Sequence, residues 1–138
     1  MIRLIYVSKQ SDGLSDSDIE SILDVARANN SGVDVTGVLI VTETMFIQAL
    51  EGASSAVMDL YAQIEKDPRH HSAEIVLREP IEERAFSDWS MGFVRRTDAE
   101  VEADLGSEGV VGSEGLFDHL LAEKSLTGRM LTRLARKN

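Results

Sequence analysis

The feature that most constrains the fold is the order in which the hydrophobic period changes along the chain. Apolar and polar positions alternate at 2–8, which predicts a strand with Ile2, Leu4 and Tyr6 on one face. A helix is predicted next, because S-D-I-E at 17–20 matches a capping box. Apolar residues then recur at helical spacing: Ile19, Ile22, Leu23 and Ala26. The run N-N-S-G at 29–32 is expected to end this helix, since Asn and Gly tolerate the left-handed conformation of helix ends.

The same pattern then recurs with additional strands. Apolar strands are predicted at 35–42 and 45–51, close enough to form a hairpin. Helical spacing returns after Gly52 in Val57, Leu60, Tyr61 and Ile64, and Asp-Pro at 67–68 stops that helix. Further strands are predicted at 73–77 and 91–94. The order β-α-β-β-α-β with an additional strand predicts an α+β, ferredoxin-like fold, in which a mixed or antiparallel sheet carries two helices on one face.

A helical extension is predicted at 96–138, after a domain formed by residues 1–95. Its apolar residues follow helical spacing, with a break expected near 125–128: Leu116, Phe117, Leu120, Leu121, Leu126, Met130, Leu131 and Leu134. These helices are expected to cover the other face of the sheet or to pack against a second subunit. The sequence therefore predicts a homodimer or a larger homo-oligomer.

Composition limits the class of protein and its partners. A chain of 138 residues suits one domain with a sizeable core. A net charge of −10 argues against a nucleic-acid partner, whose phosphates attract Lys and Arg. The chain has no cysteine, which excludes disulfides and thiolate metal sites, and no metal site is predicted. Apolar runs fall short of the roughly 18 residues that a membrane span needs. We expect a soluble, cytoplasmic protein, because the N-terminus has the pattern of a strand rather than of a signal peptide.

A glutamine interrupts the apolar strand F-I-Q-A-L-E-G at 46–52. Alternation places Gln48 on a core-facing position, where an unpaired amide group costs about 1–3 kcal/mol. The predicted topology makes this strand the neighbour of the first one, so that Tyr6 and Gln48 could lie side by side under the helices. Further polar groups are expected near the same region: Ser8, Asn30, Arg69 and His70. Each alone has an ordinary structural explanation, but together they predict one ligand pocket.

Six segments at matching spacing resemble the BLUF domain, a family of blue-light sensors that use FAD. The segments are L-I-Y-V-S (4–8), A-R-A-N-N (26–30), V-T-G-V-L (35–39), F-I-Q-A-L-E-G (46–52), D-P-R-H (67–70) and R-A-F-S-D-W-S-M-G-F (84–93). The resemblance covers residues 1 to about 95. It implies a flavin held between the two helices, with FAD expected and FMN possible because few motif residues reach beyond the ribityl chain.

The resemblance also implies a role for each matching residue. Tyr6 and Gln48 match the photoactive pair, in which light drives electron and proton transfer from the tyrosine and rearranges the glutamine hydrogen bonds, shifting the spectrum to the red. Trp89 and Met91 match the pair that is thought to transmit the signal, although which of them faces the flavin is left open. Residues expected to contact the cofactor are Ser8, Ile22, Asn30, Leu39, Phe46, Gln48, Ile64, Arg69 and His70.

The function implied is that of a photoreceptor of the short stand-alone type rather than an enzyme. Nothing after residue 95 resembles a cyclase, a phosphodiesterase or a DNA-binding domain, so the signal is expected to pass through the sheet to a separate, unidentified protein. One alternative is a flavin oxidoreductase, which reduced nicotinamide would bleach rapidly under anaerobic conditions. Another is a flavin-free ferredoxin-like binding module, which would purify without yellow colour.

Overall fold

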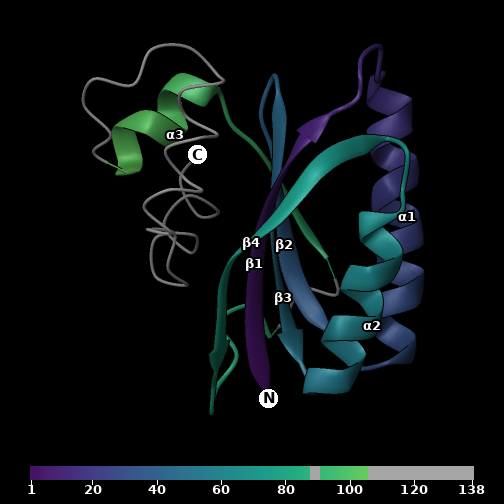
Figure 1. Ribbon diagram of the computed structural model, residues 1–138, viewed down its shortest axis with the longest axis vertical. Coiled ribbons are helices and arrows are strands. Elements are labelled where there is room, and N and C mark those ends of the chain that lie inside the picture. The colour runs from purple at the N-terminus through teal and green to yellow at the C-terminus, as the bar shows by residue number, and fades with distance from the viewer. Residues whose placement is uncertain (88–90, 106–138) are drawn as a thin grey trace.

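A computed structural model describes residues 1–87 and 91–105 of the chain. Its five-stranded sheet has the order β4-β1-β3-β2-β5. The strands are β1 (Ile2–Gln10), β2 (Thr36–Val41), β3 (Met45–Gly52), β4 (His70–Pro80) and β5 (Gly92–Arg95). The helices α1 (Asp16–Gly32) and α2 (Ser54–Glu65) cover one face, and α3 (Asp98–Leu105) lies on the other side of the sheet (Figure 1). Neighbouring strands are antiparallel except β2 and β5, so the prediction of a mixed, ferredoxin-like sheet is confirmed.

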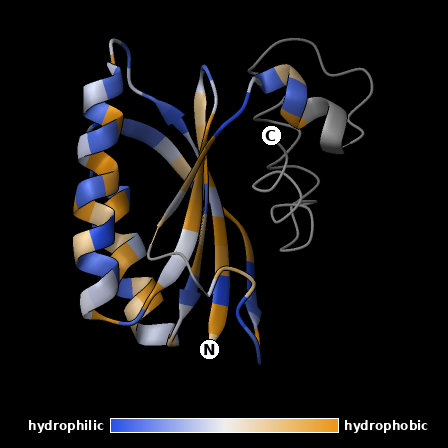
Figure 2. Cartoon of the chain, turned by 180° about the vertical axis from the view of Figure 1, so that it is seen from behind, coloured by the Kyte–Doolittle hydropathy of each residue, from blue (hydrophilic) through white to orange (hydrophobic). Residues whose placement is uncertain are grey.

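Both faces of the sheet are apolar, and each contributes to its own core. Leu4 and Tyr6 of β1 pack with Leu23 of α1 under the two helices. Ile5 and Val7 of the same strand point to the other face. Figure 2 shows the hydrophobic residues gathered along the central strands. Because β3 is buried along its whole length, any polar side chain on it needs a partner inside the protein.

The start of α1 differs from the predicted capping box at 17–20. Ser15 is the N-cap: its Oγ accepts a hydrogen bond from the Asp18 N–H at 3.2 Å, and the Asp18 carboxylate accepts one from the Ser15 N–H at 2.9 Å. This register puts Leu14 before the cap and Ile19 at the fourth helical position, the arrangement of a hydrophobic staple. Both side chains pack into the core beneath α1 and α2. This packing explains why the helix is capped by Ser15 rather than by Ser17.

The end of α1 also differs in detail from the sequence prediction. The helix continues through the N-N-S-G run to Gly32. The left-handed conformation falls two residues later, on Asp34 with φ of 55°. Arg84 stabilises this corner by donating to the Asp34 carbonyl at 2.8 Å and to the Thr36 hydroxyl at 3.1 Å. The turn is therefore supported by a residue that lies far away in the sequence.

A buried carboxylate ties the loop after β4 to the sheet. Glu51 of β3 is fully buried and accepts three hydrogen bonds. The donors are Arg3 Nε at 2.8 Å, the Ala85 N–H at 3.1 Å and the Phe86 N–H at 2.8 Å. Its charge is thus paired and hydrogen-bonded, as a buried carboxylate requires. The contact fixes the chain shortly before it returns to the sheet as β5.

Only the first part of the predicted C-terminal extension belongs to the described residues. Val101 of α3 is fully buried and packs in the core on the face opposite to α1 and α2. The apolar positions predicted to form the later helices, at 116–134, lie outside the described residues. Across the described part of the chain, no helix combines the length and the apolar character needed to cross a membrane.

Gly37 marks the place where β2 approaches β3 most closely, and we expect Gly37→Ala to be strongly destabilising. A Cβ built on Gly37 would lie 2.0 Å from the carbonyl oxygen of Ala49, which is backbone and cannot move aside alone. Overpacking costs about 1–3 kcal/mol in free energy of unfolding, and we expect the upper end of this range here because the contact is with backbone. The control is Gly32→Ala, where an added Cβ meets nothing within 4 Å. Urea denaturation should show a change below about 1 kcal/mol there, and equal effects of the two substitutions would contradict the prediction.

Candidate functional site

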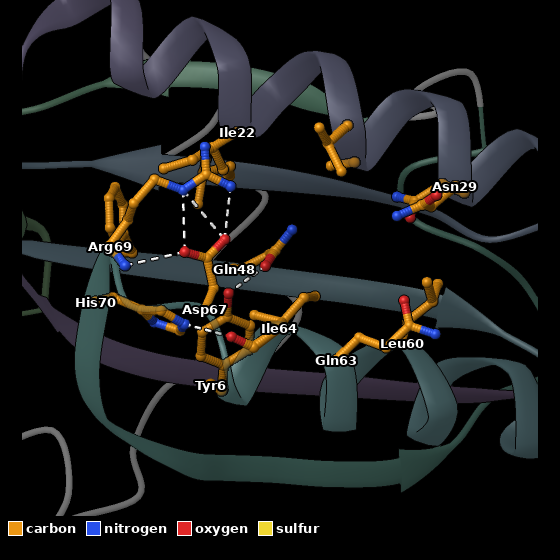
Figure 3. Close-up of a pocket in the computed structure, with 15 residues that line it drawn as sticks. Tyr6, Ile22, Asn29, Gln48, Leu60, Gln63, Ile64, Asp67, Arg69 and His70 are labelled. Carbon is orange, nitrogen blue, oxygen red and sulfur yellow. Dashed lines mark hydrogen bonds and ion pairs between the residues drawn. The ribbon is translucent and has the colours of Figure 1, made fainter.

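A cavity of about 230 Å³ lies between α1 and α2, above β1 and β3 (Figure 3). Residues spaced i, i+3, i+4 and i+7 on α1 form one wall: Ile22, Val25, Ala26 and Asn29. The same spacing on α2 and the turn after it forms the opposite wall: Leu60, Gln63, Ile64 and Asp67. Side chains from the strands form the floor, and others complete the lining: Tyr6, Asn30, Leu39, Phe46, Gln48, Arg69 and His70.

A hydrogen-bonded pair of polar side chains lies at the floor of this cavity. Tyr6 and Gln48 are directly opposite one another in the β1–β3 ladder, and both are buried. The Tyr6 hydroxyl donates to Gln48 Oε1 (Figure 3). The Gln48 amide nitrogen donates to Met91 Sδ at 3.3 Å. The oxygen and the nitrogen of the buried Gln48 amide therefore each have a hydrogen-bond partner, as a polar side chain in a buried strand requires.

Burial raises the pKa values of both tyrosines of the chain. It is the main cause of the raised pKa of Tyr6, and the charges of Tyr61 and Asp67 raise this pKa further. The Tyr61 ring meets the Tyr6 ring edge-on, with centroids 5.4 Å apart. The pKa of Tyr61 is raised to about 12, first by burial and then by the carboxylates of Glu65 and Glu74. At neutral pH, Tyr6 thus holds a proton that it can donate.

The raised pKa values predict that both phenols titrate at higher pH than an ordinary tyrosine. A tyrosine whose pKa is raised in the folded state stabilises that state below pH 10, the ordinary pKa of the unfolded chain, and this stability is lost as pH rises beyond it. Carbon-13 labelling of the tyrosine Cζ atoms should give two NMR signals that stay at neutral positions through pH 10 and shift only at higher pH, the Tyr6 signal last. Independent titration of either phenol near pH 10 in the folded protein would be inconsistent with this burial.

His70 is held in one orientation at the side of the cavity. Its Nε2 lies 2.5 Å from the carbonyl oxygen of Ile64, which can only accept, so this nitrogen carries a proton. Its Nδ1 lies 2.7 Å from the hydroxyl of Ser8. The ring stands edge-on to Phe46, with centroids 6.1 Å apart. Ser8, which the sequence predicts to contact a cofactor, is fully buried, lies outside the cavity lining and bonds His70.

An ion pair stands at the end of the cavity opposite to Asn29 (Figure 3). The Arg69 Nη2 lies 2.6 Å from Asp67 Oδ2, and Arg69 Nε lies 2.9 Å from Asp67 Oδ1. The hydrogen bond from Arg69 is the main cause that holds the pKa of Asp67 below its usual range, so this carboxylate is ionised at neutral pH. Arg69 was predicted from the sequence to belong to the site, whereas Asp67 was interpreted only as part of the helix stop. The signal available in the sequence was an Asp after a helix, because an Asp side chain often bonds the backbone two residues later, as Asp67 does with the Arg69 N–H at 2.9 Å.

The structure brings together most of the residues that the sequence singled out. Those found in the cavity lining are Tyr6, Ile22, Asn30, Leu39, Phe46, Gln48, Ile64, Arg69 and His70. Met91 contacts Gln48 from outside the lining, and Trp89 lies outside the described residues. Residues that sequence reasoning did not assign to the site are Val25, Ala26, Asn29, Leu60, Gln63 and Asp67. Their helical spacing was the signal that could have found them.

The donors and the apolar walls suit a flat heteroaromatic ring. Ile22 and Ile64 face the cavity from opposite helices, so that a planar group between them would have apolar contacts on both sides. Gln48 offers an amide at the floor, Asn29 is at one end and Arg69 is at the other, and Asn30 also belongs to the lining. A flavin ring has this same combination of apolar faces and a polar edge. The residues present therefore fit a flavin.

A family profile identifies the class of protein that this fold and site define. The profile described as "BLUF: Sensors of blue-light using FAD" matches residues 1–92. Such proteins are flavin-using light sensors. The chain belongs to the BLUF family.

Curated relatives include two subunits of photoactivated adenylate cyclases. The beta subunit of Euglena longa is 35% identical over 89 residues, which are 64% of this chain and 10% of the relative. The alpha subunit of Euglena gracilis is 37% identical over 86 residues, covering 62% of this chain and 8% of the relative. The chain thus spans about a tenth of the length of these relatives.

Solved structures with a similar fold include both short and long proteins. BlrB, a BLUF protein in its dark state, is 31% identical with a TM-score of 0.70, covering 96% of this chain and 95% of that one. BlsA in its photo-activated state is 29% identical with a TM-score of 0.71, covering 91% and 95%. A bacterial light-regulated adenylyl cyclase is 30% identical with a TM-score of 0.65, covering 96% of this chain but only 36% of the cyclase.

Proposed function

We propose that this protein is a blue-light photoreceptor that binds FAD non-covalently between α1 and α2 and passes its signal to a separate protein. The observation that carries the proposal is the buried hydrogen bond from Tyr6 to Gln48 at the floor of the cavity. Non-covalent binding is supported by the absence of cysteine from the sequence. Denaturation should therefore release all of the flavin into solution.

The cavity residues divide into those that would pack on the flavin and those that would bond it. Ile22, Leu39, Phe46 and Ile64 supply apolar contacts. Asn30, Arg69 and His70 supply polar groups at the edges of the cavity, with His70 held in place by Ser8. Bound flavin would supply the blue-light absorption and the electron acceptor. We propose FAD from the family description, and chromatography of the released flavin distinguishes it from FMN.

Within this site, we assign Tyr6 as the electron and proton donor and Gln48 as the group that stores the light state. Tyrosine is a readily oxidised side chain, and the neutral Tyr6 hydroxyl holds a proton that is already directed to Gln48 Oε1. Gln48 has an acceptor directed to Tyr6 and a donor directed to Met91. A rearranged amide that exchanges these two ends would place an oxygen against Met91 Sδ, which has no proton to donate. The Gln48–Met91 contact would then be lost in the light.

Loss of the Gln48–Met91 contact would transmit the light signal from the cavity to the sheet. Met91 is buried and directly precedes β5, which runs parallel to β2 from the Gly92–Val38 pair onward. A change at Met91 would therefore act on β5, which is an edge strand of the sheet and is followed in the chain by α3. We propose signal transmission through Met91 on this basis, and through Trp89 on the family resemblance.

We also propose that the output protein is a separate chain. The similarity to BlrB and BlsA, which this chain matches over 95% of their lengths, supports this proposal. The net charge of −10 disfavours nucleic acid as the partner. A homodimer or larger homo-oligomer in the cytoplasm remains our expectation, and light scattering in darkness and under blue light would measure its mass.

A light-minus-dark absorption spectrum of the purified full chain tests the proposed function. We expect a yellow protein whose flavin spectrum shifts to the red after blue light and returns in darkness. Bleaching by reduced nicotinamide without oxygen would instead support an oxidoreductase. A colourless protein that does not take up added flavin would support a flavin-free binding module. Either result would overturn the photoreceptor proposal.

A further inference from the structure

An arginine on the outer side of α1 reaches the backbone beside the photoactive pair. Arg27 Nε donates to the carbonyl oxygen of Met91 at 3.1 Å, joining positions that are 64 residues apart. Arg27 is not part of the cavity lining. It lies instead in a surface groove between α1 and β5, together with Phe93 and Arg95. The contact therefore links the outside of α1 to the start of β5.

Met91 is held at two points by residues from different elements. Its side chain is 2% exposed, and Sδ accepts from the Gln48 amide at 3.3 Å. Its backbone carbonyl accepts from Arg27. A contact to sulfur is weak and depends on the position of the acceptor, whereas a guanidinium is always charged and has donors in a fixed geometry. Arg27 is thus the stronger of the two constraints on Met91.

From this arrangement we infer that Arg27 is a positioning residue, which holds Met91 where Gln48 can bond it and thereby favours the dark arrangement of the amide. The inference rests on the proposed function of the Tyr6–Gln48 pair. Without Arg27, Met91 is less firmly placed, and the return of Gln48 to its bond with Met91 becomes slower. We expect Arg27→Leu to slow dark recovery at least three-fold in the flavin-loaded full chain.

Matched variants separate the hydrogen bond from the loss of a surface charge. Arg95→Leu removes a cation from the same groove, but Arg95 pairs with Asp16 and lies over the Phe93 ring rather than touching Met91. Its recovery should stay within 1.5-fold of the unchanged protein. Arg27→Gln keeps an N–H donor as many bonds from Cβ as Arg Nε but removes the charge. It should restore most of the normal recovery rate.

A second readout reports the position of Met91 without any light reaction. Methionine labelled with carbon-13 at the methyl group gives one NMR signal for each of the five methionines, and Met91→Leu identifies the signal of Met91. In the dark, Arg27→Leu should shift the Met91 signal, whereas Arg95→Leu should leave it in place. A general loss of folding would shift several methionine signals together, so a selective change reports positioning.

The possible outcomes separate this inference from the proposed function. Absence of a red shift in the unchanged protein would overturn the proposed function and the recovery argument with it. A normal red shift, with an unchanged Met91 signal and an unchanged recovery rate in Arg27→Leu, would overturn the role of Arg27 alone. If Arg27→Leu does not fold, Arg27→Ala takes its place, because alanine favours the helix and has no side-chain donor. Normal recovery and an unmoved Met91 signal in Arg27→Ala would equally refute the inference.

Discussion

Tyr6→Phe should abolish the red shift after blue light while the fold and the bound flavin are retained. The substitution removes one hydroxyl, whose hydrogen bond goes to Gln48 Oε1, and keeps the ring that packs edge-on against Tyr61. Its cost in free energy of unfolding should be about 1–2 kcal/mol. Phenylalanine is much harder to oxidise than tyrosine and has no hydroxyl proton to transfer. Tyr6→Phe therefore lacks the electron and proton donor, although the flavin cavity is intact.

The matched control for this substitution is Tyr61→Phe. Tyr61 is the other tyrosine of the chain, packs against Tyr6 and does not belong to the cavity lining. Light-minus-dark spectra of both variants, at equal flavin occupancy, should show no shift for Tyr6→Phe and a shift of normal size for Tyr61→Phe. A normal red shift in flavin-loaded Tyr6→Phe would refute the assignment of Tyr6 as the donor.

Gln48→Leu should abolish the red shift by a different route. The donor Tyr6 remains, but leucine has no amide that can exchange its hydrogen bonds between Tyr6 and Met91. The Tyr6 hydroxyl loses its acceptor, so we expect a cost of about 1–3 kcal/mol, partly offset by apolar burial. Time-resolved spectroscopy separates the two variants: Tyr6 should still be oxidised transiently in Gln48→Leu, but no lasting shifted state should follow.

Gln10→Leu is the control for the loss of a glutamine from this sheet. The Gln10 amide donates to the Thr42 carbonyl at 2.6 Å and lies outside the cavity lining. The variant should keep a red shift of normal size, although the loss of its hydrogen bond lowers stability. A lasting red shift in Gln48→Leu would show that the light state is stored elsewhere, and the assignment of Gln48 would then be wrong.

Local pattern was sufficient to predict the sheet and the polar pair at its centre. Alternation in β1 and β3 assigns Tyr6 and Gln48 to one face, and the order of elements makes these strands neighbours. Both properties depend on residues close in sequence and on a small set of allowed connections. For the same reason the helix faces were predicted correctly, including the positions of Ile22 and Ile64.

The cavity itself depends on distances between elements that the local pattern does not contain. Periodicity shows that Asn29 and Gln63 share a face with apolar neighbours, but only the spacing of α1 and α2 makes those faces the walls of a cavity. Whether such faces close on each other or leave a cavity depends on how the helices pack over the sheet. The same limit applies to the register of α1, where S-D-S-D permits two caps and packing of Leu14 with Ile19 selects one.

By itself, the sequence determined the order of the strands and helices along the chain and the faces they bury, which placed Tyr6 and Gln48 on the same face of neighbouring strands, because these properties follow from periodicity and chain connection. Only the tertiary structure decided that Ser8 holds His70 and that Met91 lies between Gln48 and Arg27. These contacts join residues 62, 43 and 64 positions apart. Their formation depends on side-chain reach and on the three-dimensional packing of separate elements, and no spacing along the chain encodes such a distance.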